Sequence, residues 1–287
     1  MQTQIILDKT GIHYKNGGHE VGSGHMTLDL LGINKFYAYQ SSRKYFFLFW
    51  ALFTLVLIGF LQYWAALIAP PLLLFAPSKH LYIQYVMDKK TNDEWIAFLS
   101  NLHNLCTGTQ LWIEGKATEN INTKYHAGAY QSVNREHLDI AYIDQKGITG
   151  LGLNATFSVP TFRLYTWSLI ILFVPNGIII QRDNVLITYS YDELQLESST
   201  THFIEDNPVA PDAEVIDYTW RYINRDGSPD GRFKNNKRLP VCINGKFTVH
   251  APELDFTFQT SGKEVAARIV ESLASRAEYI ARFVKNP

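Results

Sequence analysis

The sequence is short of charge, and the shortage is partly local. Charged residues make up 18% of the 287 residues, against roughly 25% in an average globular chain. The 33 residues from 45 to 77 contain no charged residue, where the chain's own average would give about six. This distribution excludes a wholly soluble protein as the default expectation.

Cysteine is also scarce. The two cysteines, Cys106 and Cys242, lie far apart and form neither a CxxC motif nor a zinc-type spacing. A disulfide framework is therefore excluded, and the thiols are expected to be reduced and cytosolic. The net charge of −1 creates no global field that would attract nucleic acid or an anionic membrane, so such binding would need a local patch.

Enzyme signatures are absent from the chain. There is no GxSxG, P-loop or HExxH motif, and no GxGxxG follows an expected strand. Asp226 and Asp230, a possible carboxylate pair, lie in Asp-Gly and Pro-Asp dipeptides that are typical of turns. The chain is therefore predicted to be no enzyme and to hold no cofactor or metal. A hydrolase or transferase without a recognised motif is the enzymatic alternative.

What the chain does contain is one long apolar run, residues 45–77. A membrane span needs about 20 apolar residues. The run is therefore either one span with a proline-broken extension or a short helical hairpin that turns near residues 62–64. Basic residues flank both ends, and the positive-inside rule places both flanks in the cytoplasm, which favours the hairpin. We expect a bacterial inner-membrane protein with its soluble domain and both termini in the cytoplasm. The flanking basic residues are Lys35, Arg43, Lys44, Lys79, Lys89 and Lys90.

Three residues within the run could have a role beyond contact with lipid: Thr54, Gly59 and Gln62. One interpretation is helix packing, in which a small residue allows close approach. The other makes them the wet face of an oligomeric pore. The prolines of the run free carbonyl groups that need partners in lipid, so we expect a homo-oligomer.

Outside this run the chain reads as strands and two helices. A hairpin turn is expected at Asn16-Gly17-Gly18, and a helix runs from a capping box of Thr91 and Glu94 to Gly108. Residues 111–137 read as a functional loop or a mobile linker, and an amphipathic helix follows a cap at Ser261 and Glu264. A strand or a helix extension is expected at residues 81–87, and period-two strands at 138–143, 156–159, 165–174, 177–182, 185–191, 215–223, 239–243, 246–249 and 254–259.

Antiparallel strands closed by a C-terminal helix resemble a pleckstrin-homology-like barrel over about residues 165–287. The predicted fold class is therefore an α+β membrane protein: a short transmembrane helical hairpin joined to a cytosolic antiparallel β-barrel or sheet. The expected divisions are a β-rich segment at 1–44, the membrane segment at 45–77, a helix and strands at 78–164, and the barrel with its helix at 165–287.

A second resemblance lies in TWRYINRDGSPDGRFKNN, residues 219–236, with YSYDEL and HFIEDNPVAPDAEV upstream. These segments, with LWIEG and NTKYHAGA (122–129), resemble a module of uncharacterised bacterial membrane-associated proteins. Gly231 stands where arginine would be expected before Arg232, which removes a cation from the loop. The resemblance implies no chemistry.

The best candidate site is basic. Between residues 221 and 246 lie seven cations and two carboxylates, and aromatic residues flank the arginines, which suits phosphate contact with base stacking. A solvated face is an alternative, as are lipid headgroups and pairing with the acidic stretch 205–217. The candidate ligand-binding residues are Arg221, Arg225, Arg232, Lys234, Lys237 and Arg238; Lys246 completes the count.

Taken together, the layout resembles channel-type effectors of bacterial anti-phage defence. This resemblance implies an oligomeric, ligand-gated pore whose cytosolic β domain senses a nucleotide or a short nucleic-acid oligomer, with a neighbouring-gene regulator as a further partner. The alternative is a membrane-tethered adaptor whose barrel binds lipid headgroups or a partner protein.

Overall fold

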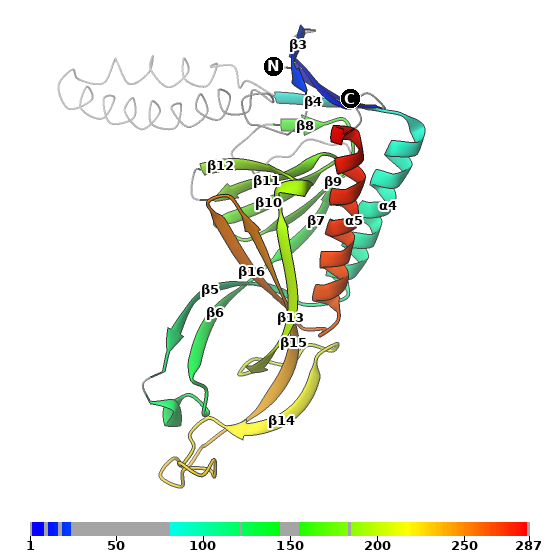
Figure 1. Ribbon diagram of the computed structural model, residues 1–287. Coiled ribbons are helices and arrows are strands. Elements are labelled where there is room, and N and C mark those ends of the chain that lie inside the picture. Colours follow the sequence, from blue (N-terminus) through cyan, green and yellow to red (C-terminus); the bar gives the residue numbers. More distant parts are fainter. Residues whose placement is uncertain are drawn as a thin grey trace, which may run out of the picture.

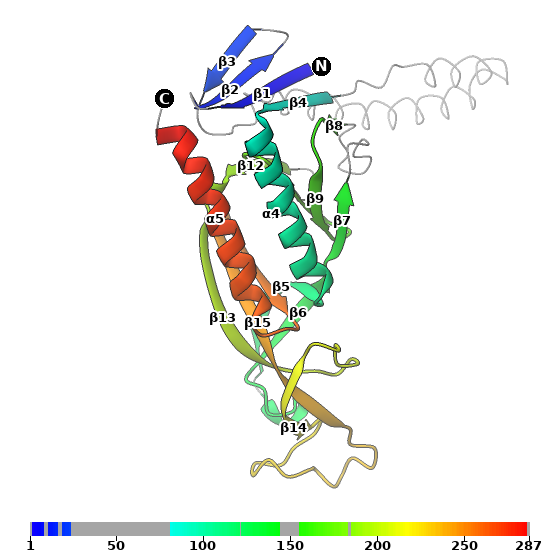
Figure 2. The same cartoon turned by 90° about the vertical axis from the view of Figure 1, so that its right-hand side faces the viewer.

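The structure is a computed structural model that describes residues 2–8, 11–16, 19–23, 81–120, 122–143, 155–182 and 185–285. These residues form three β-sheets and two α-helices (Figure 1). The helices lie side by side against the second and third sheets of the order given below, and the third sheet extends beyond them into a distal end (Figures 1 and 2).

The first sheet is mixed and has the order β3-β2-β1-β4-β8. Strands β2 and β3 form the expected hairpin, with Asn16 opposite His19, whereas β1 and β4 run parallel. Residues 81–87, which the sequence left open between strand and helix, are a strand. The bounds are β1 Gln2–Asp8, β2 Gly11–Asn16, β3 His19–Ser23, β4 Leu81–Met87 and β8 Ala155–Phe157.

The second sheet is antiparallel with the order β12-β11-β10-β9-β7. Its central strands are almost wholly buried. Ile171, Phe173, Ile178 and Ile180 face a core that they share with both helices and with the third sheet. The bounds are β7 Asp139–Ile143, β9 Thr161–Tyr165, β10 Leu169–Val174, β11 Gly177–Arg182 and β12 Val185–Ser190.

The third sheet has the order β13-β15-β16-β5-β6, and β14 pairs with the first part of β15. Strand β15 is 14 residues long and runs through both the packed body and the distal end. The bounds are β5 Leu111–Glu119, β6 Gln131–His137, β13 Gln195–Ile204, β14 Glu214–Trp220, β15 Arg238–Ala251 and β16 Leu254–Thr260.

Helices α4 (Lys89–Thr107) and α5 (Val265–Lys285) pack against each other and against the sheets. Arg276 of α5 is buried, donates to the carbonyl of Pro175 and lies over the rings of Trp95 and Tyr279. A buried guanidinium needs such partners, so this contact fixes α5 over the β10–β11 turn. Two short 3-10 helices complete the elements, η2 at Thr123–Tyr125 and η3 at Tyr191–Glu193.

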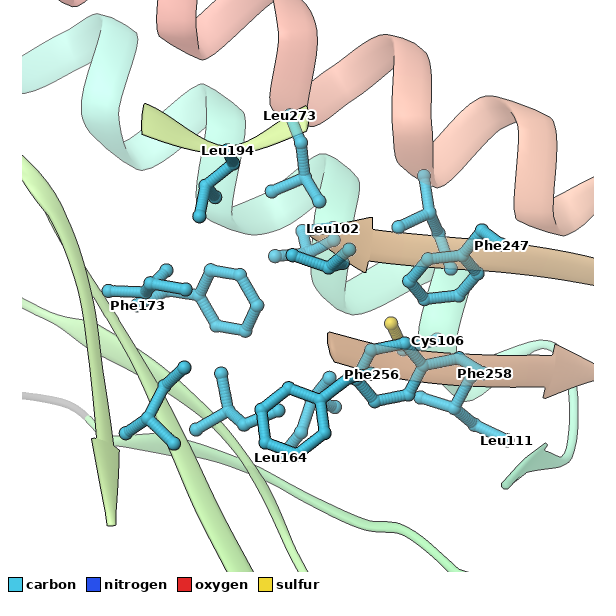
Figure 3. Close-up of a pocket in the computed structure, with 15 residues that line it drawn as sticks. Leu102, Cys106, Leu111, Leu164, Phe173, Leu194, Phe247, Phe256, Phe258 and Leu273 are labelled. Atoms are coloured by element: carbon cyan, nitrogen blue, oxygen red, sulfur yellow. The ribbon is translucent and has the colours of Figure 1, made fainter. Parts of the chain in front are cut away.

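The core between the second sheet, the third sheet and both helices is apolar and contains a cavity of about 30 Å³. Leucine, isoleucine, valine and phenylalanine side chains and Cys106 line it (Figure 3). Burial raises the pKa of the Cys106 thiol to about 12, so this sulfur behaves as a small apolar group. The cavity is too small and too apolar for a ligand, and we interpret it as a packing void.

The predicted fold class is wrong. The described part of the chain is mostly β-sheet with only two α-helices, and neither is long and apolar enough to cross a membrane. The physical reason is that α4 and α5 each carry charged residues around one apolar stripe, which packs on the sheets. The run at 45–77 lies outside the described residues.

Two predicted strand boundaries are also wrong. Residues 165–174 are not one core strand, because a turn at residues 166–168 separates β9 from β10. The Thr166 hydroxyl accepts the amides of Ser168 and Leu169 at 3.2 and 3.1 Å, which stabilises the turn and leaves Trp167 90% exposed.

The two strands expected at 239–243 and 246–249 are one strand, because Asn244 and Gly245, a dipeptide typical of turns, both lie within β15. A Cβ atom on Gly245 would come within 2.9 Å of the Ala266 Cβ and of the Gly262 carbonyl oxygen. This glycine therefore lets the start of α5 approach the strand, which is a packing role that resembles a turn signal in sequence.

Two further segments were assigned differently from the sequence. Residues 111–137, expected as a loop or linker, form the β5–β6 hairpin, and β13 was not predicted at all. Helix α4 begins before Thr91, since Asp88 is the N-cap and accepts the Thr91 amide at 2.7 Å; its end at Gly108 is confirmed. The domain divisions stay predictions, although β9 crosses the boundary at 164/165 and β5 pairs with β16.

Candidate functional site

The third sheet splits at its distal end and encloses a cavity. Strand β5 pairs with β16 only over Leu111–Ile113, and beyond this point the β5–β6 hairpin curves away from the sheet. Strand β14 takes the place of β16 beside β15. The hairpin faces β13, β15 and β14 (Figure 1), and residues of these strands line a half-open cavity of about 850 Å³. This volume lies within the range of small-molecule sites.

The cavity lining mixes hydroxyl, amide, imidazole and charged groups with aliphatic and aromatic side chains. Polar groups can therefore orient a bound molecule while the apolar ones contact its body. Its polar and aromatic lining includes Glu114, Tyr125, His126, Tyr130, Gln131, Ser132, Thr201, His202, Phe203, Asp206, Thr219, Arg221, Lys246 and Gln259.

Polar side chains from four strands connect at one part of the cavity wall. The Lys246 ammonium lies 3.1 Å from a Glu114 carboxylate oxygen, and the Gln259 amide donates to the other oxygen of that carboxylate. The Gln259 carbonyl oxygen accepts from Arg135 at 3.2 Å. Each charge here is paired, so the cavity itself carries no strong excess of either sign.

A buried ion pair holds the β5–β6 hairpin to the end of β13. Arg135 donates to both oxygens of Glu205 at 2.7 and 2.8 Å, and each side chain is 8% exposed. The guanidinium also lies between the rings of Trp112 and Phe203, at 4.2 and 3.5 Å from their centres. Loss of one partner would leave an uncompensated buried charge, which makes this pair a strong constraint on the shape of the cavity.

The far end of the cavity is closed by two loops, residues 122–129 and 221–237. The amide of Ala127 donates to the Arg221 carbonyl, and that of Ile223 to the Lys124 carbonyl, both at 3.1 Å. Their rings also meet: Tyr222 and Phe233 stack at 3.9 Å, and Tyr125 contacts both edge-on. The structure thus brings NTKYHAGA and TWRYINRDG together, two segments that the sequence assigned to one module.

The loop at 221–237 is fixed by its own side chains. Asn236 both donates to and accepts from the backbone of Tyr222, and Asp226 accepts the amide and the hydroxyl of Ser228. Asp230 accepts from Arg232 through side chain and backbone, and this pairing lowers the pKa of Asp230 to about 2. Both carboxylates therefore have the turn role that the sequence predicted for them.

Four of the six candidate ligand-binding cations have partners within the chain. Lys237 and Arg221 both contact Asp206, and the hydrogen bond from Lys237 is the largest cause that lowers the pKa of this carboxyl. Arg232 pairs with Asp230, and Arg238 lies 4.5 Å from the Tyr218 ring centre. The alternative of pairing with the acidic stretch 205–217 therefore holds for Arg221 and Lys237.

The other two candidates, Arg225 and Lys234, are exposed and form no ion pair with any described residue. Lys124 lies on the neighbouring loop, close enough to Asp230 to help lower its pKa. We call Lys124, Arg225 and Lys234 the basic tip. It contains fewer available cations than the sequence count suggested, because carboxylates pair with Arg221, Arg232 and Lys237 and because Arg238 lies over the Tyr218 ring.

Other expected site residues fall elsewhere. Thr54, Gly59 and Gln62 lie outside the described residues. Within the part of the chain that the structure describes, no group of three or more His, Cys, Asp or Glu side chains could hold a metal ion. Sequence reasoning missed Arg135 and Tyr130 because residues 111–137 were interpreted as a loop, and β6 (QSVNREH) has a single apolar residue to indicate a strand. It missed the pairing of Glu205 because β13, which ends next to this residue, was not predicted.

Comparison of the chain with protein-family models, with curated proteins and with solved structures finds no match. The resemblances noted from the sequence therefore stay predictions, and the site must be interpreted from its own geometry.

Proposed function

We propose that the chain is a non-catalytic recognition protein whose distal end binds an anionic ligand, a nucleotide or a short nucleic-acid oligomer. The observation that supports this most is the exposure of Arg225 and Lys234 on a loop whose shape is already fixed by internal hydrogen bonds. Cations presented on an ordered loop lose little conformational freedom on binding, so phosphate contact is more favourable there.

An exposed aromatic ring, that of Tyr125, lies next to the basic tip and favours a ligand that carries bases. Tyr125 and Tyr130 line the cavity and are 50% and 82% exposed. Tyr125 also contacts the stacked rings of Tyr222 and Phe233, which hold it in place. Stacking of a base on such a ring contributes about 1–3 kcal/mol. In this arrangement the phosphates contact the tip and a base enters the mouth of the cavity.

The role as a pore-forming effector of anti-phage defence depended on a membrane hairpin and is not part of this proposal. Ligand recognition at the distal end is independent of that hairpin, because every residue that supports it lies at 122–133 or 219–237.

Anisotropy of a labelled, 5′-phosphorylated single-stranded oligonucleotide, titrated at several salt concentrations, tests the proposal. The double variant Arg225→Glu and Lys234→Glu should bind at least about tenfold more weakly, and its log–log salt slope should fall by about 1.4 if each residue neutralises one phosphate. Arg232 is left intact because it pairs with Asp230, and its loss would disturb the loop.

The matched control is Lys89→Glu with Lys90→Glu. Both lysines are exposed at the start of α4, far from the distal end, and the charge change is identical. Equal losses in the two double variants, or no binding by the wild type at low salt, would overturn the proposal. Inorganic polyphosphate that competes as well as an oligonucleotide of equal charge would remove the role of the bases.

A further inference from the structure

Strand β13 has one unpaired edge. It pairs with β15 through ten consecutive partners, from Gln195 opposite His250 to Ile204 opposite Val241. No backbone hydrogen bond from its other side to any described residue is found. Figure 2 shows β13 along the outer margin of the molecule. At every second residue of β13, the backbone amide and carbonyl point to this edge and can pair with another strand.

The other free edges of this sheet carry the features that normally prevent pairing, and β13 does not. Strand β14 has a bulge and the acidic residues Glu214 and Asp217, while the β5–β6 pair is irregular and β6 carries Arg135 and Glu136. Strand β13 has no bulge, no proline and a single charged residue, Glu197. A long, regular edge with so little charge is suited to pair with another strand.

Symmetry restricts how two copies of this edge could pair. Rotation about a two-fold axis perpendicular to a sheet leaves each side chain on the same face of the sheet. Residues directly opposite each other also share a face. Because side chains alternate with a period of two, a residue can then oppose only a residue of the same parity. The axis must therefore lie midway between the two copies of one residue, so that this residue is opposite itself.

Among the possible centres, Thr200 is the one that places the two aliphatic residues of the strand opposite each other, Leu196 and the partner's Ile204. On the same face Ser198 lies opposite the partner's His202, with the two Thr200 hydroxyls beside the axis; on the other face Glu197 lies opposite the partner's Phe203. A centre at Thr201 would place Ser198 opposite the partner's Ile204, and a centre at Ser199 would place Leu196 opposite the partner's His202, so either one loses the aliphatic pair.

We propose that a second copy of this chain pairs antiparallel along β13, centred on Thr200, so that the third sheets of two subunits join into one. The central residues of this pairing, Ser198, Ser199 and Thr200, are exposed and carry hydroxyl groups. Water can therefore solvate this edge in the single chain before it associates. The basic tip takes no part in this interface, because neither Arg225 nor Lys234 lies on β13, although Thr201, His202 and Phe203 of β13 also line the cavity.

Cysteine cross-linking tests the register. Thr200→Cys brings two thiols together at the axis, where directly opposed Cα atoms of an antiparallel pair lie about 4.5–5.5 Å apart, within the range of about 4.4–6.8 Å that a disulfide spans. Ser198→Cys is the control, because its two thiols would be four residues out of register. The native cysteines do not interfere, since Cys106 and Cys242 are both buried.

The full chain with Thr200→Cys should become a covalent dimer under mild oxidation, while Ser198→Cys should remain a single chain on a non-reducing gel. The wild type should sediment at twice the mass of one chain and dissociate on dilution. A wild type that sediments as one chain at every concentration overturns the proposal, whether or not another protein pairs with the edge. A dimer that fails to cross-link at Thr200 also overturns it.

Discussion

The packed body, in which both helices cover the sheets, differs from the distal end of the third sheet in what its strands surround. Strand β15 runs through both, yet in the body its neighbours enclose an apolar void of about 30 Å³, whereas at the distal end they enclose a polar cavity of about 850 Å³. Apolar side chains fill the first, and paired charges line the second. The candidate site therefore arises where the third sheet splits: the β5–β6 hairpin leaves β16, and β14 replaces β16 beside β15.

The two cysteines report on the two regions. Cys106 lines the apolar void, while Cys242 lies on β15 close enough to Glu205 and Arg135 for these charges to affect its pKa. Burial is the largest cause that raises the pKa of both thiols. Their reaction with a thiol reagent therefore measures opening, and the two rates compare the regions directly.

The largest expected effect comes from emptying the body. Phe258→Ala removes a ring that is 2% exposed and stacks on Phe247 at 4.7 Å. It should lower the free energy of unfolding by about 3–5 kcal/mol, measured by urea denaturation. Trp167→Ala, at 90% exposure, should change it by less than about 0.5 kcal/mol. Similar losses in both variants would show that the void does not mark the stabilising core.

Breaking the buried ion pair should open the distal end alone. Glu205→Gln leaves Arg135 buried without its charge partner and should cost about 3–5 kcal/mol of local stability. Cys242 should then react with a thiol reagent in native buffer while Cys106 stays protected. Arg135→Met combined with Glu205→Leu removes both charges and should restore much of the protection of Cys242. Equal exposure of both thiols in Glu205→Gln would contradict a separable distal end.

A glycine at the junction of the two regions provides a smaller effect. Gly245→Ala places a Cβ within 2.9 Å of α5 and should cost about 1–3 kcal/mol in thermal or urea unfolding, because the strand or the helix must shift. Gly231→Ala, whose Cβ would meet no atom within 4 Å, is the control and should leave stability unchanged. Stability of Gly245→Ala equal to the wild type would show that the helix can move freely over β15.

The smallest effect concerns one carboxyl of the distal loop. The pairing with Arg232 holds the pKa of Asp230 at about 2, below its usual range, so the charged pair is complete above about pH 4 and is lost as pH falls toward 2. Arg232→Gln removes the cation and should raise this pKa toward the ordinary aspartate value. Carbon-13 NMR of the carboxyl measures the shift, and an unchanged midpoint would show that Arg232 does not set it.

The parts of the fold that the sequence predicts are those with a strong period and a clear stop. The stripe of Ile269, Leu273 and Ile280 in α5 is buried as predicted, and Gly108 ends α4. Strand β13 was not predicted, because its centre, Ser-Ser-Thr-Thr, has no alternation of apolar and polar residues. Edge strands are exposed on more than one side, so burial does not shape their sequences strongly.

The site could be predicted only in composition. The count of cations between residues 221 and 246 was correct, but it could not show which of them are neutralised. Asp206, which forms ion pairs with Arg221 and Lys237, lies 15 and 31 residues away from them along the chain. Likewise, the partners Arg135 and Glu205 are 70 residues apart. Such pairings depend on strand order, which a single sequence does not reveal.

Hydrogen exchange of the unmodified protein, with and without a 5′-phosphorylated oligonucleotide, tests the central claim most directly. The account predicts slower exchange at residues 122–133 and 219–237 when the oligonucleotide is present, with α4 and the β10–β11 hairpin unchanged. Protection confined to the packed body, or none at the distal loops at an oligonucleotide concentration that saturates anisotropy, would contradict it.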